Sequence, residues 1–396
     1  MRSSIPLVLA ALAGLQAALA YPGMGQKLEE IKKLKPRQSS EMIGDLAYLE
    51  DDELTPTGRA VRDILNGDAQ GEDLTSTYLL PPPRDSAACA ADTCCIWKYI
   101  ANEMRDAMIG SALRCNNVAR AAVRLGFHDA GTWSKSTGTG GGADGSVVLA
   151  GECEARTDNL GLAEICTQMR TWYNKYKGYG VSMADLIQMA ANVGTVVCPL
   201  GPRVRSFVGR LDSSQPSPTG LLPSPFDSVD DMLELFADKT IDAHDLVALV
   251  GAHSTSQQRF VDTSRAGDPQ DRTPGVWDVN FYGETMNANS PRRIFKFQSD
   301  ILLSQDPRTR PTWLAFTNQV TGQIPWNLAY ARAYVRLSLL GVYNINSLTE
   351  CTKVLPPIVV GTFLNPDQIL LDLFLNGPRN TAASDVLFNG DLLSVL

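Results

Sequence analysis

An arginine and a histidine four residues apart are the side chains in this sequence best suited to chemistry. Arg124 and His128 belong to the run ARAAVRLGFHDA, whose good helix formers continue without a proline and predict a helix. Residues four apart project from the same helix face, so the two side chains are expected together. A guanidinium that is always charged would then stand beside an imidazole that can be neutral near pH 7.

Hard oxygen donors follow this pair. Asp129 comes directly after the histidine and points to another side of the helix, and a glycine-rich loop then ends in the run GADGS at residues 142–146. Carboxylates, a hydroxyl and loop carbonyls are the kind of ligand that calcium takes in proteins. The segment therefore predicts a calcium site beside the arginine and the histidine.

Two motifs in this stretch resemble those of a known family. RLGFHDAGTW followed by GGGADGS is similar to the distal half of a haem peroxidase of the secreted fungal class, class II of the plant-type superfamily. Further spaced motifs extend the match roughly from Cys89 to Pro357. The resemblance implies that Arg124 and His128 lie above the haem iron and that Phe127 lines the pocket. It also implies a calcium ion held by Asp129, Gly142, Asp144 and Ser146.

A second stretch, Asp245–Asp278, resembles the proximal half of the same family. Its apolar residues 246–250 predict a buried helix that ends at Ala252-His253-Ser254. The resemblance implies that His253 is the axial ligand of the iron. The loop that follows would bind a second calcium ion through Ser254, Asp271, Thr273, the carbonyl of Val276, and Asp278.

Two further residues would orient the histidines. The resemblance implies that Asn159, in the run NLGL, accepts the Nδ1 proton of His128 and leaves Nε2 as the free base. Asp300, in the run FQSD, would accept the Nδ1 proton of His253 and push electron density toward the iron.

The chain departs from the family pattern at two positions close to these residues. Cys153 stands where the family has a glutamate that supports the asparagine. Glu152 and Glu154 flank it, so we expect this support to be shifted or lost. Gln270 stands where relatives carry an aromatic side chain beneath the haem, which affects proximal packing and reduction potential but not ligation of the iron.

The N-terminus and the cysteines indicate export. Met1–Ala20 has one arginine, an apolar run and a small-residue cleavage site, as a secretory signal does, and no later apolar run is long enough to span a bilayer. Eight cysteines in an exported chain indicate four disulfides. The resemblance implies Cys115–Cys198, and either Cys94 or Cys95 joined to Cys351 with its neighbour closing on Cys89. We expect Cys94–Cys351 with Cys89–Cys95, which leaves Cys153–Cys166, a pair with no obvious counterpart in the family's usual set.

Composition limits the range of partners. The chain has 396 residues, of which 44% are hydrophobic and 20% charged, and this suits a globular protein with a large core. The formal charge of −8 and the lack of a basic patch argue against nucleic acid or an anionic membrane as a partner. We expect a secreted, extracellular monomer.

We expect a mainly α fold of about ten or more helices in two lobes around the haem, with short strands at most. The expected parts are a signal peptide (1–20), a candidate pro-segment and N-terminal extension (21–88), a haem peroxidase domain (89–365) and a C-terminal tail (366–396). The distal lobe would cover about 89–225 and the proximal lobe about 226–365. Part of the extension is expected to be loose, and the tail to be loop-rich and to wrap the domain.

Several single residues also carry expectations. We place Trp97, Trp313 and Trp326 in the core and His244 on the solvated surface. Ser228 and Asp242 are candidate helix caps. A helix is expected from Cys94 to about Leu113.

These assignments predict a haem peroxidase with one haem b and two calcium ions. Neutral His128 would take a proton from hydrogen peroxide and return it to the leaving oxygen, while Arg124 stabilises the developing charge. Phenolic or aromatic donors would then supply two electrons singly. An alternative is a secreted haem- and calcium-binding protein with little turnover, which the intact Arg124–His128 pair opposes. An intracellular type of peroxidase with a protein radical is opposed by the signal, the disulfides and Gln270.

Two substrate classes are excluded by the same reasoning. Manganese-oxidising relatives carry two glutamates and an aspartate where this chain has Ala121, Asn117 and Arg259. A dication needs carboxylate oxygens, and the arginine would repel it. Lignin-oxidising relatives carry an exposed tryptophan where this chain has Ala248. Trp133 and Tyr179 remain as other aromatic side chains that could pass electrons if they are exposed.

Overall fold

Helices form almost all of the regular structure in the computed structural model, which describes residues 39–359 and 361–394. The expected signal (1–20) and the lysine-rich segment up to residue 37 lie outside the described residues. Within them are sixteen α-helices, eight 3₁₀-helices and four two-residue strands. The fold is therefore mainly α, as predicted.

The elements are as follows. The α-helices are α3 (Pro56–Asn66), α4 (Ala87–Ala90), α5 (Thr93–Met108), α6 (Asn117–Ala130), α7 (Ser146–Leu149), α8 (Glu152–Ala155), α9 (Ala163–Tyr176), α10 (Met183–Val197), α11 (Val229–Ala237), α12 (Ala243–Val250), α13 (Asn280–Met286), α14 (Gln298–Gln305), α15 (Arg310–Phe316), α16 (Gln323–Leu337), α17 (Gln368–Asn376) and α18 (Thr381–Phe388). The 3₁₀-helices are η2 (Gly44–Ala47), η3 (Lys135–Thr137), η4 (Thr157–Asn159), η5 (Lys177–Tyr179), η6 (Gly251–Thr255), η7 (Thr263–Arg265), η8 (Ile345–Ser347) and η9 (Thr352–Val354). The strands β1 (Phe207–Val208) and β4 (Thr349–Glu350) pair antiparallel, as do β2 (Gln257–Gln258) and β3 (Asp268–Pro269).

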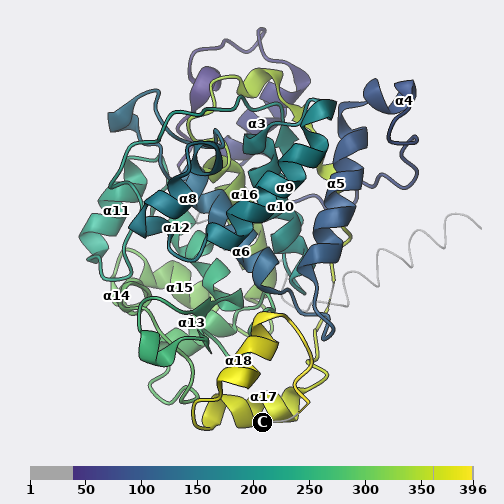
Figure 1. Cartoon of the computed structure of the whole chain (residues 1–396). Helices are drawn as coiled ribbons and strands as arrows, with labels where there is room; N and C mark the ends of the chain where they lie inside the picture. The colour runs from purple at the N-terminus through teal and green to yellow at the C-terminus, as the bar shows by residue number, and fades with distance from the viewer. Residues whose placement is uncertain (1–38, 360, 395–396) are drawn as a thin grey trace, which may run out of the picture.

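Helix α10 is the centre of the distal half. Every one of its residues is buried, and it packs against α6 and α5 (Figure 1). The Ser182 hydroxyl caps its N-terminus by accepting a hydrogen bond from Asp185 N at 3.1 Å. Trp97, on α5, is buried as expected, but α5 ends at Met108 rather than near Leu113.

An aromatic cluster fills the proximal half. Helix α12 packs against α16, and Trp313 and Trp326 are fully buried, as expected. Their indole nitrogens donate to backbone carbonyls, Trp326 to Ala248 O at 2.9 Å and Trp313 to Tyr282 O at 3.0 Å. Buried indole N–H groups need such partners, and these two have them, whereas the indole nitrogen of Trp277, which stacks on Trp326, has none among the described residues. These helices support the segment that carries His253.

Our expectation for His244 was wrong. The residue lies on α12 and is buried, with its ring edge-on to Phe316 at 6.1 Å. The expected cap is present two residues earlier, because the Asp242 carboxylate accepts from His244 N at 2.9 Å and Asp245 N at 3.0 Å. Ser228 likewise caps α11 through Asp231 N at 3.2 Å. Packing by α15, which is distant in sequence, covers His244.

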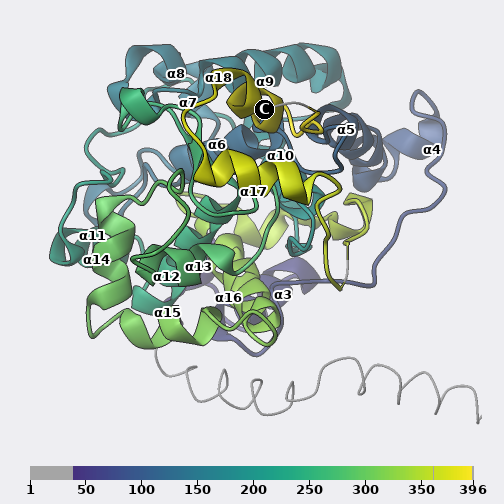
Figure 2. The same cartoon turned by 90° about the horizontal axis from the view of Figure 1, so that it is seen from below.

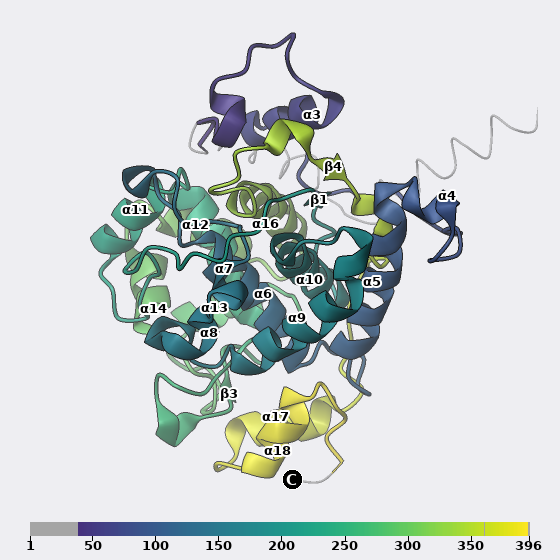
Figure 3. The ribbon, with the colours of Figure 1, turned by 45° about the horizontal axis from the view of Figure 1, so that its top comes forward.

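The first part of the described N-terminal extension, residues 39–66, packs against the main body. It lies beside α16 and β4, at the top of Figure 3. Thr55 donates two hydrogen bonds to Asn346, from N to Oδ1 at 2.8 Å and from Oγ1 to the carbonyl at 2.5 Å, and Asp45 accepts from Ile345 N and Asn346 N. The buried guanidinium of Arg336 adds bonds to the carbonyls of residues 39 and 41. These contacts span nearly 300 residues of sequence, which is why sequence patterns gave no sign of them.

The C-terminal tail contains two helices, so its expected loop-rich character was wrong. Helices α17 and α18 lie at the opposite end of the molecule from α3 (Figure 1), and they are in front in the view from below (Figure 2). They form a small apolar core of their own, with Leu371, Phe374 and Leu387 among its buried members. The buried ion pair Arg114–Asp367, at 2.7 Å, joins the tail to the main body. The tail does cover part of the domain, as expected.

Four disulfides join all eight cysteines, in the pairs Cys89–Cys95, Cys94–Cys351, Cys115–Cys198 and Cys153–Cys166. Cys115–Cys198 is the pair that the resemblance implied, Cys94–Cys351 with Cys89–Cys95 is the expected one of its two alternatives, and Cys153–Cys166 is the pair that was left over. Among residues 39–359 and 361–394, no helix has the length and apolar character needed to cross a membrane.

Candidate active site

Helix α6 holds Arg124 and His128 on one face. The Asn116 side chain caps the helix by accepting from Val118 N at 2.9 Å and Ala119 N at 3.3 Å. Both functional side chains reach the same segment, residues 157–160, which includes the 3₁₀-helix η4. The four-residue spacing therefore brings the pair together as predicted.

Asn159 determines which nitrogen of His128 carries the proton. Its Nδ2 donates to the backbone carbonyl of Glu152 at 3.0 Å, so its Oδ1 faces His128 Nδ1 at 2.8 Å. That oxygen only accepts, which places the proton on Nδ1 and leaves Nε2 with a free lone pair. Burial, and then the charge of Arg124, keep the pKa of His128 well below its usual value of 6.5. The imidazole is thus a neutral base at neutral pH.

The support for Asn159 is shifted by one residue, as the sequence suggested. Cys153, at the position of the family's glutamate, is tied to Cys166. The preceding residue, Glu152, holds the asparagine through its backbone carbonyl instead. The Glu152 carboxylate is anchored by Ser217 N at 2.7 Å and by Arg156 at 2.7 Å. The glutamate is therefore present, but it acts through the main chain.

Arg124 is held by two carbonyls. Its guanidinium donates to Leu160 O at 2.6 Å and to Asp158 O at 3.2 Å. One side of the group is open to solvent, yet the protein atoms packed around it lower its pKa to about 10. Arg124 therefore stays charged at neutral pH. Phe127, on the same helix, is half-buried and stacks on Phe236 at 6.1 Å.

His253 lies on η6, because α12 ends at Val250 and continues as a 3₁₀ turn rather than an α-helix. Its Nδ1 is 3.1 Å from Asp300 Oδ2, and Asp300 is fully buried. The rings of Phe281 and Phe297 pack edge-on against the imidazole at 5.8 and 5.4 Å. The structure thus brings together the histidine and aspartate that the sequence paired.

Oxygen ligands gather behind His128. The buried Asp129 carboxylate accepts from Gly145 N at 3.1 Å, and Asp144 Oδ1 accepts from Ser146 N at 3.0 Å. Burial and the charge of Asp144 raise the pKa of Asp129 well above its usual value. The buried Ser146 hydroxyl has no hydrogen-bond partner among the described residues. Two carboxylates therefore lie close together beside a hydroxyl that has no hydrogen-bond partner. A bound cation would stabilise both negative charges and give the hydroxyl a partner.

A similar group of oxygens follows His253. The Ser254 hydroxyl donates to Val276 O at 3.0 Å, and Thr273 Oγ1 bridges Asp278 Oδ2 at 2.8 Å and Asp271 Oδ1 at 3.2 Å. Asp271 Oδ2 is buried and has no partner among the described residues. Burial raises the pKa of Asp278 to about 6 and, with the charge of Asp278, that of Asp271 well above its usual value.

Each group holds two carboxylates only. Across residues 39–359 and 361–394, no three His, Cys, Asp or Glu side chains gather in a metal-binding arrangement. Hydroxyls and carbonyls complete both groups, as calcium permits.

Comparison with known proteins gives the family. A family model described as "Peroxidase" matches residues 100–319, more than half of the 396 residues. The chain belongs to the peroxidase family. It is 32% identical over 289 residues to the peroxidase of Arthromyces ramosus, covering 67% of this chain and 77% of that protein. It is 30% identical over 315 residues to Ligninase C of Trametes versicolor (73% and 82%) and 32% over 301 residues to Manganese peroxidase 3 of Phlebia radiata (70% and 81%).

The fold and enzyme class predicted from the sequence are thereby confirmed. The protein is a haem peroxidase, an oxidoreductase that reduces hydrogen peroxide and oxidises aromatic donors. The four disulfides fit folding in an oxidising compartment.

The residues present in this peroxidase fit a haem. His253 keeps 34% of its side-chain surface exposed despite the rings packed around it, so the imidazole opens to free space on one side. Asp300 occupies Nδ1, and Nε2 has no hydrogen-bond partner among the described residues, which leaves it able to bind iron. On the distal side, Arg124 is likewise open along one edge.

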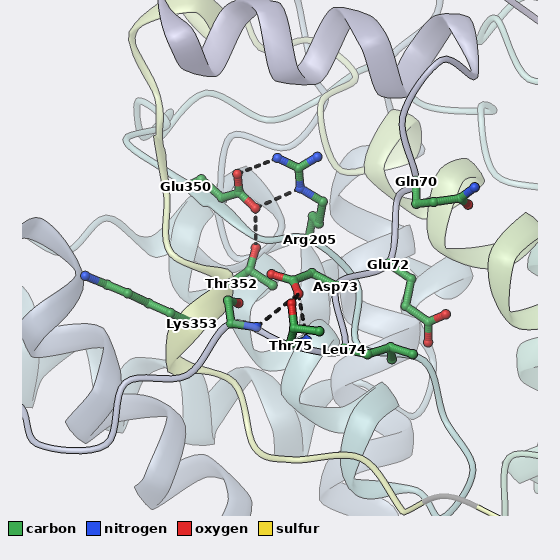
Figure 4. Close-up of a pocket in the computed structure, with 10 residues that line it drawn as sticks. Gln70, Glu72, Asp73, Leu74, Thr75, Arg205, Glu350, Thr352 and Lys353 are labelled. Atoms are coloured by element: carbon green, nitrogen blue, oxygen red, sulfur yellow. Dashed lines mark hydrogen bonds and ion pairs between the residues drawn. The ribbon is translucent and has the colours of Figure 1, made fainter. Parts of the chain in front are cut away.

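A surface pocket of about 620 Å³ lies elsewhere in the peroxidase, between the N-terminal extension and β4 (Figure 4). Glu72, Asp73, Arg205, Glu350 and Lys353 are among its lining residues, and none of the expected site residues is. Arg205 donates twice to the Glu350 carboxylate, at 2.8 and 2.6 Å. Burial raises the pKa of Glu72 to about 7. The pocket reflects the packing of the extension and is separate from the two histidines.

Sequence reasoning missed three hydrogen-bond partners in the site. The carbonyls of residues 158 and 160 hold Arg124, and backbone acceptors leave no sequence signal. Gln270 was noted as a departure, but its amide donates to Asp300 Oδ2 at 3.3 Å, which was not foreseen. The only sequence signal for this hydrogen bond was a polar side chain at a position where a buried side chain is expected.

Proposed function

We propose that His128 and Arg124 activate hydrogen peroxide in this peroxidase. Nε2 of His128 takes a proton from the bound peroxide and delivers it to the leaving oxygen as general acid. The guanidinium of Arg124 stabilises the negative charge that develops as the O–O bond breaks. The observation that carries this proposal is the buried, neutral His128 with its Nδ1 proton fixed by Asn159.

His253 would hold the iron through Nε2, with Asp300 as the acceptor of its Nδ1 proton. When bound, the haem supplies the two electrons that reduce peroxide and takes them back from donors in single steps. The hydrogen bond to a buried carboxylate fixes the imidazole and makes it a stronger electron donor. Phe281 and Phe297 keep the ring in one orientation through edge contacts.

We propose small phenolic and aromatic molecules as donors. Two exposed apolar side chains, Leu160 and Phe260, lie close to Arg124: Leu160 provides its acceptor carbonyl, and Phe260 packs on Gly161. A Cβ added at Gly161 would lie 2.5 Å from the Phe260 ring and 3.4 Å from Arg124 Nη1. An aromatic donor can therefore contact apolar surface near the distal pair.

Two calcium ions would complete the site. The first would bind to Asp129, Gly142, Asp144 and Ser146, and the second to Ser254, Asp271, Thr273, Val276 and Asp278. The unpartnered Ser146 hydroxyl and Asp271 Oδ2 support both assignments. Because each group follows a functional histidine directly, the ions would fix the positions of His128 and His253.

We further propose that the protein is secreted and acts as an extracellular monomer. The signal-like residues 1–20 and the four disulfides support secretion.

The test is a comparison of two histidine variants with the wild-type holoenzyme. His128→Ala should retain haem but react with peroxide about 10²–10⁴-fold more slowly in stopped-flow absorbance. His253→Ala should lose stable haem, measured as the ratio of Soret to protein absorbance. A dye-oxidation assay on the wild type separates an active peroxidase from a haem-binding protein with little turnover. A His128→Ala rate within a few-fold of wild type would remove its assigned role.

A further inference from the structure

Asp300 accepts hydrogen bonds from two side chains at one oxygen. His253 Nδ1 lies 3.1 Å from Asp300 Oδ2, and Gln270 Nε2 lies 3.3 Å from the same atom. Asp300 is fully buried and Gln270 nearly so. The other carboxylate oxygen, Oδ1, is buried with no hydrogen-bond partner among the described residues. The two donors therefore share one acceptor oxygen.

The orientation of the Gln270 amide is fixed by Ser256. The Ser256 hydroxyl donates to Gln270 Oε1, and Gln270 N donates to Ser256 O at 3.2 Å. Since the amide oxygen faces a donor, the Nε2 end must face Asp300. The antiparallel pairing of β2 with β3, in which Gln257 pairs with Pro269, holds the two residues beside each other. The bond to Asp300 is thus built into the fold.

A second donor weakens the carboxylate as an acceptor for the histidine. Negative charge shared with the Gln270 amide is not available to the Nδ1–H of His253, so that hydrogen bond is weaker. A weaker bond leaves the imidazole less electron-rich and makes it a poorer donor to a bound iron. Ferric iron needs that electron density more than ferrous iron does, so the ferrous state gains relative stability.

We propose that Gln270, oriented by Ser256, is a positioning residue that raises the reduction potential of the haem by drawing charge from Asp300. The proposal rests on the proposed role of His253 as the iron ligand. It assigns a function to the one proximal position where the chain departs from the aromatic residue of its relatives.

The experiment measures the ferric/ferrous potential of purified holoenzyme and the iron–histidine stretching frequency of its ferrous form. Gln270→Met keeps the side-chain length and removes the donor. It should favour the ferric state about tenfold, which is about 59 mV for a one-electron couple, and should raise the stretching frequency. Ser256→Ala, which frees the amide, should shift both readouts the same way by a smaller amount.

Gln258→Met is the matched control. Gln258 is a buried glutamine on β2 whose amide donates to the carbonyls of residues 262 and 265 rather than to Asp300. It should leave both readouts unchanged. A Gln270→Met shift below about twofold, or an equal shift in the control, would overturn the proposal. If Gln270→Met does not fold, an unshifted Ser256→Ala overturns it alone.

His253→Ala separates this proposal from the function on which it rests. If that variant keeps the wild-type iron–histidine band, the assignment of His253 as ligand fails, and the proposal fails with it. If the band is lost and Gln270→Met still leaves the potential unchanged, His253 stands as the ligand and only the role of Gln270 is rejected.

Discussion

Oδ1 of Asn159 lies 2.8 Å from Nδ1 of His128, and the Asn159 amide is itself turned by the carbonyl of Glu152. The chain of three groups runs from α8 through η4 to α6. It fixes the imidazole tautomer without any charged partner, so the base keeps a low pKa and an available Nε2. The catalytic competence of His128 therefore depends on a residue that need not touch peroxide.

Asn159→Ala should slow the reaction with peroxide by about 10–100-fold, because the imidazole is then free to rotate and to change tautomer. The stopped-flow rate of the first absorbance change measures this. Asn192→Ala is a matched control, since Asn192 lies on the neighbouring helix α10, is also buried and donates to the Ser206 hydroxyl at 2.7 Å. The control should stay within about twofold of wild type. Equal losses in both variants would reduce Asn159 to a packing role.

The pH dependence follows from the lowered pKa of His128. The base must be neutral to accept a proton, so the peroxide rate should stay constant as the pH falls through 6.5 and decline only well below it. The charge of Arg124 contributes to this lowering. Arg124→Leu should therefore raise the pKa of His128 and move the acid limb of the rate profile to higher pH, besides reducing the rate. An unmoved limb would show that Arg124 does not act on His128.

Calcium removal should destabilise the protein most at neutral pH. Burial raises the pKa of Asp278 to about 6 and that of Asp129 well above its usual value. Without the ion, the folded state keeps these protons and loses stability as the pH rises through about 6. Calcium binds the ionised carboxylates and offsets that loss.

The measurement is the thermal midpoint with EDTA and with excess calcium, at pH 5 and pH 7.5. The difference between the midpoints with excess calcium and with EDTA should be larger at pH 7.5 than at pH 5. Asp144→Asn should shrink it, whereas Asp158→Asn, at an exposed position, should not. Active protein without bound calcium would contradict both sites.

The N-terminal extension should contribute measurably to stability. Asp45 accepts from the backbone nitrogens of Ile345 and Asn346 at 2.8 and 3.0 Å, and Asp45→Ala would orphan both donors. We expect the free energy of unfolding in urea to fall by about 1–3 kcal/mol. Asp52→Ala, at an exposed position of the same extension, is the control and should change little. A neutral Asp45→Ala would mean that the extension is held by other contacts.

Local patterns allowed much of the fold to be predicted. The four-residue spacing of Arg124 and His128 and the cap at Asp242 depend on neighbours in the chain, and both were confirmed in the structure. The tail gave a readable signal as well, since Leu371, Phe374 and Leu375 have helical spacing, but it was interpreted as loop.

The remaining features depend on contacts between distant segments. Burial of His244 needs Phe316, and the bond from Gln270 to Asp300 needs the pairing of β2 with β3. Neither arrangement leaves a periodic pattern in the sequence. Glu152 supports Asn159 through its carbonyl, and a backbone group carries no residue-specific signal. The sequence therefore drew attention to His244, Gln270 and Glu152, but it did not predict the contacts that these residues make.

Oxidation of Mn(II) should be absent from this peroxidase. Of the three positions that carry carboxylates in manganese-oxidising relatives, Arg259 is the decisive one. Its guanidinium pairs with Asp385 at 3.3 Å and lies over the Phe388 ring at 4.0 Å. Arg120, buried nearby, donates to Phe388 O at 2.6 Å.

Two arginines and helix α18 thus occupy the region where a dication would need carboxylates. We expect no saturable oxidation of Mn(II) under conditions in which a phenolic donor is turned over. Arg259→Asp alone should not create the activity, because Asp385 would be the only neighbouring carboxylate and Asn117 and Ala121 supply none. A hyperbolic dependence of rate on Mn(II) concentration in the wild type would refute this reading.

Trp133 is buried and hydrogen-bonded to Tyr343, whereas Tyr179 is 40% exposed. If a non-phenolic aromatic alcohol is oxidised, Tyr179→Phe is therefore the first variant to test, and an unchanged rate would exclude Tyr179 as the relay.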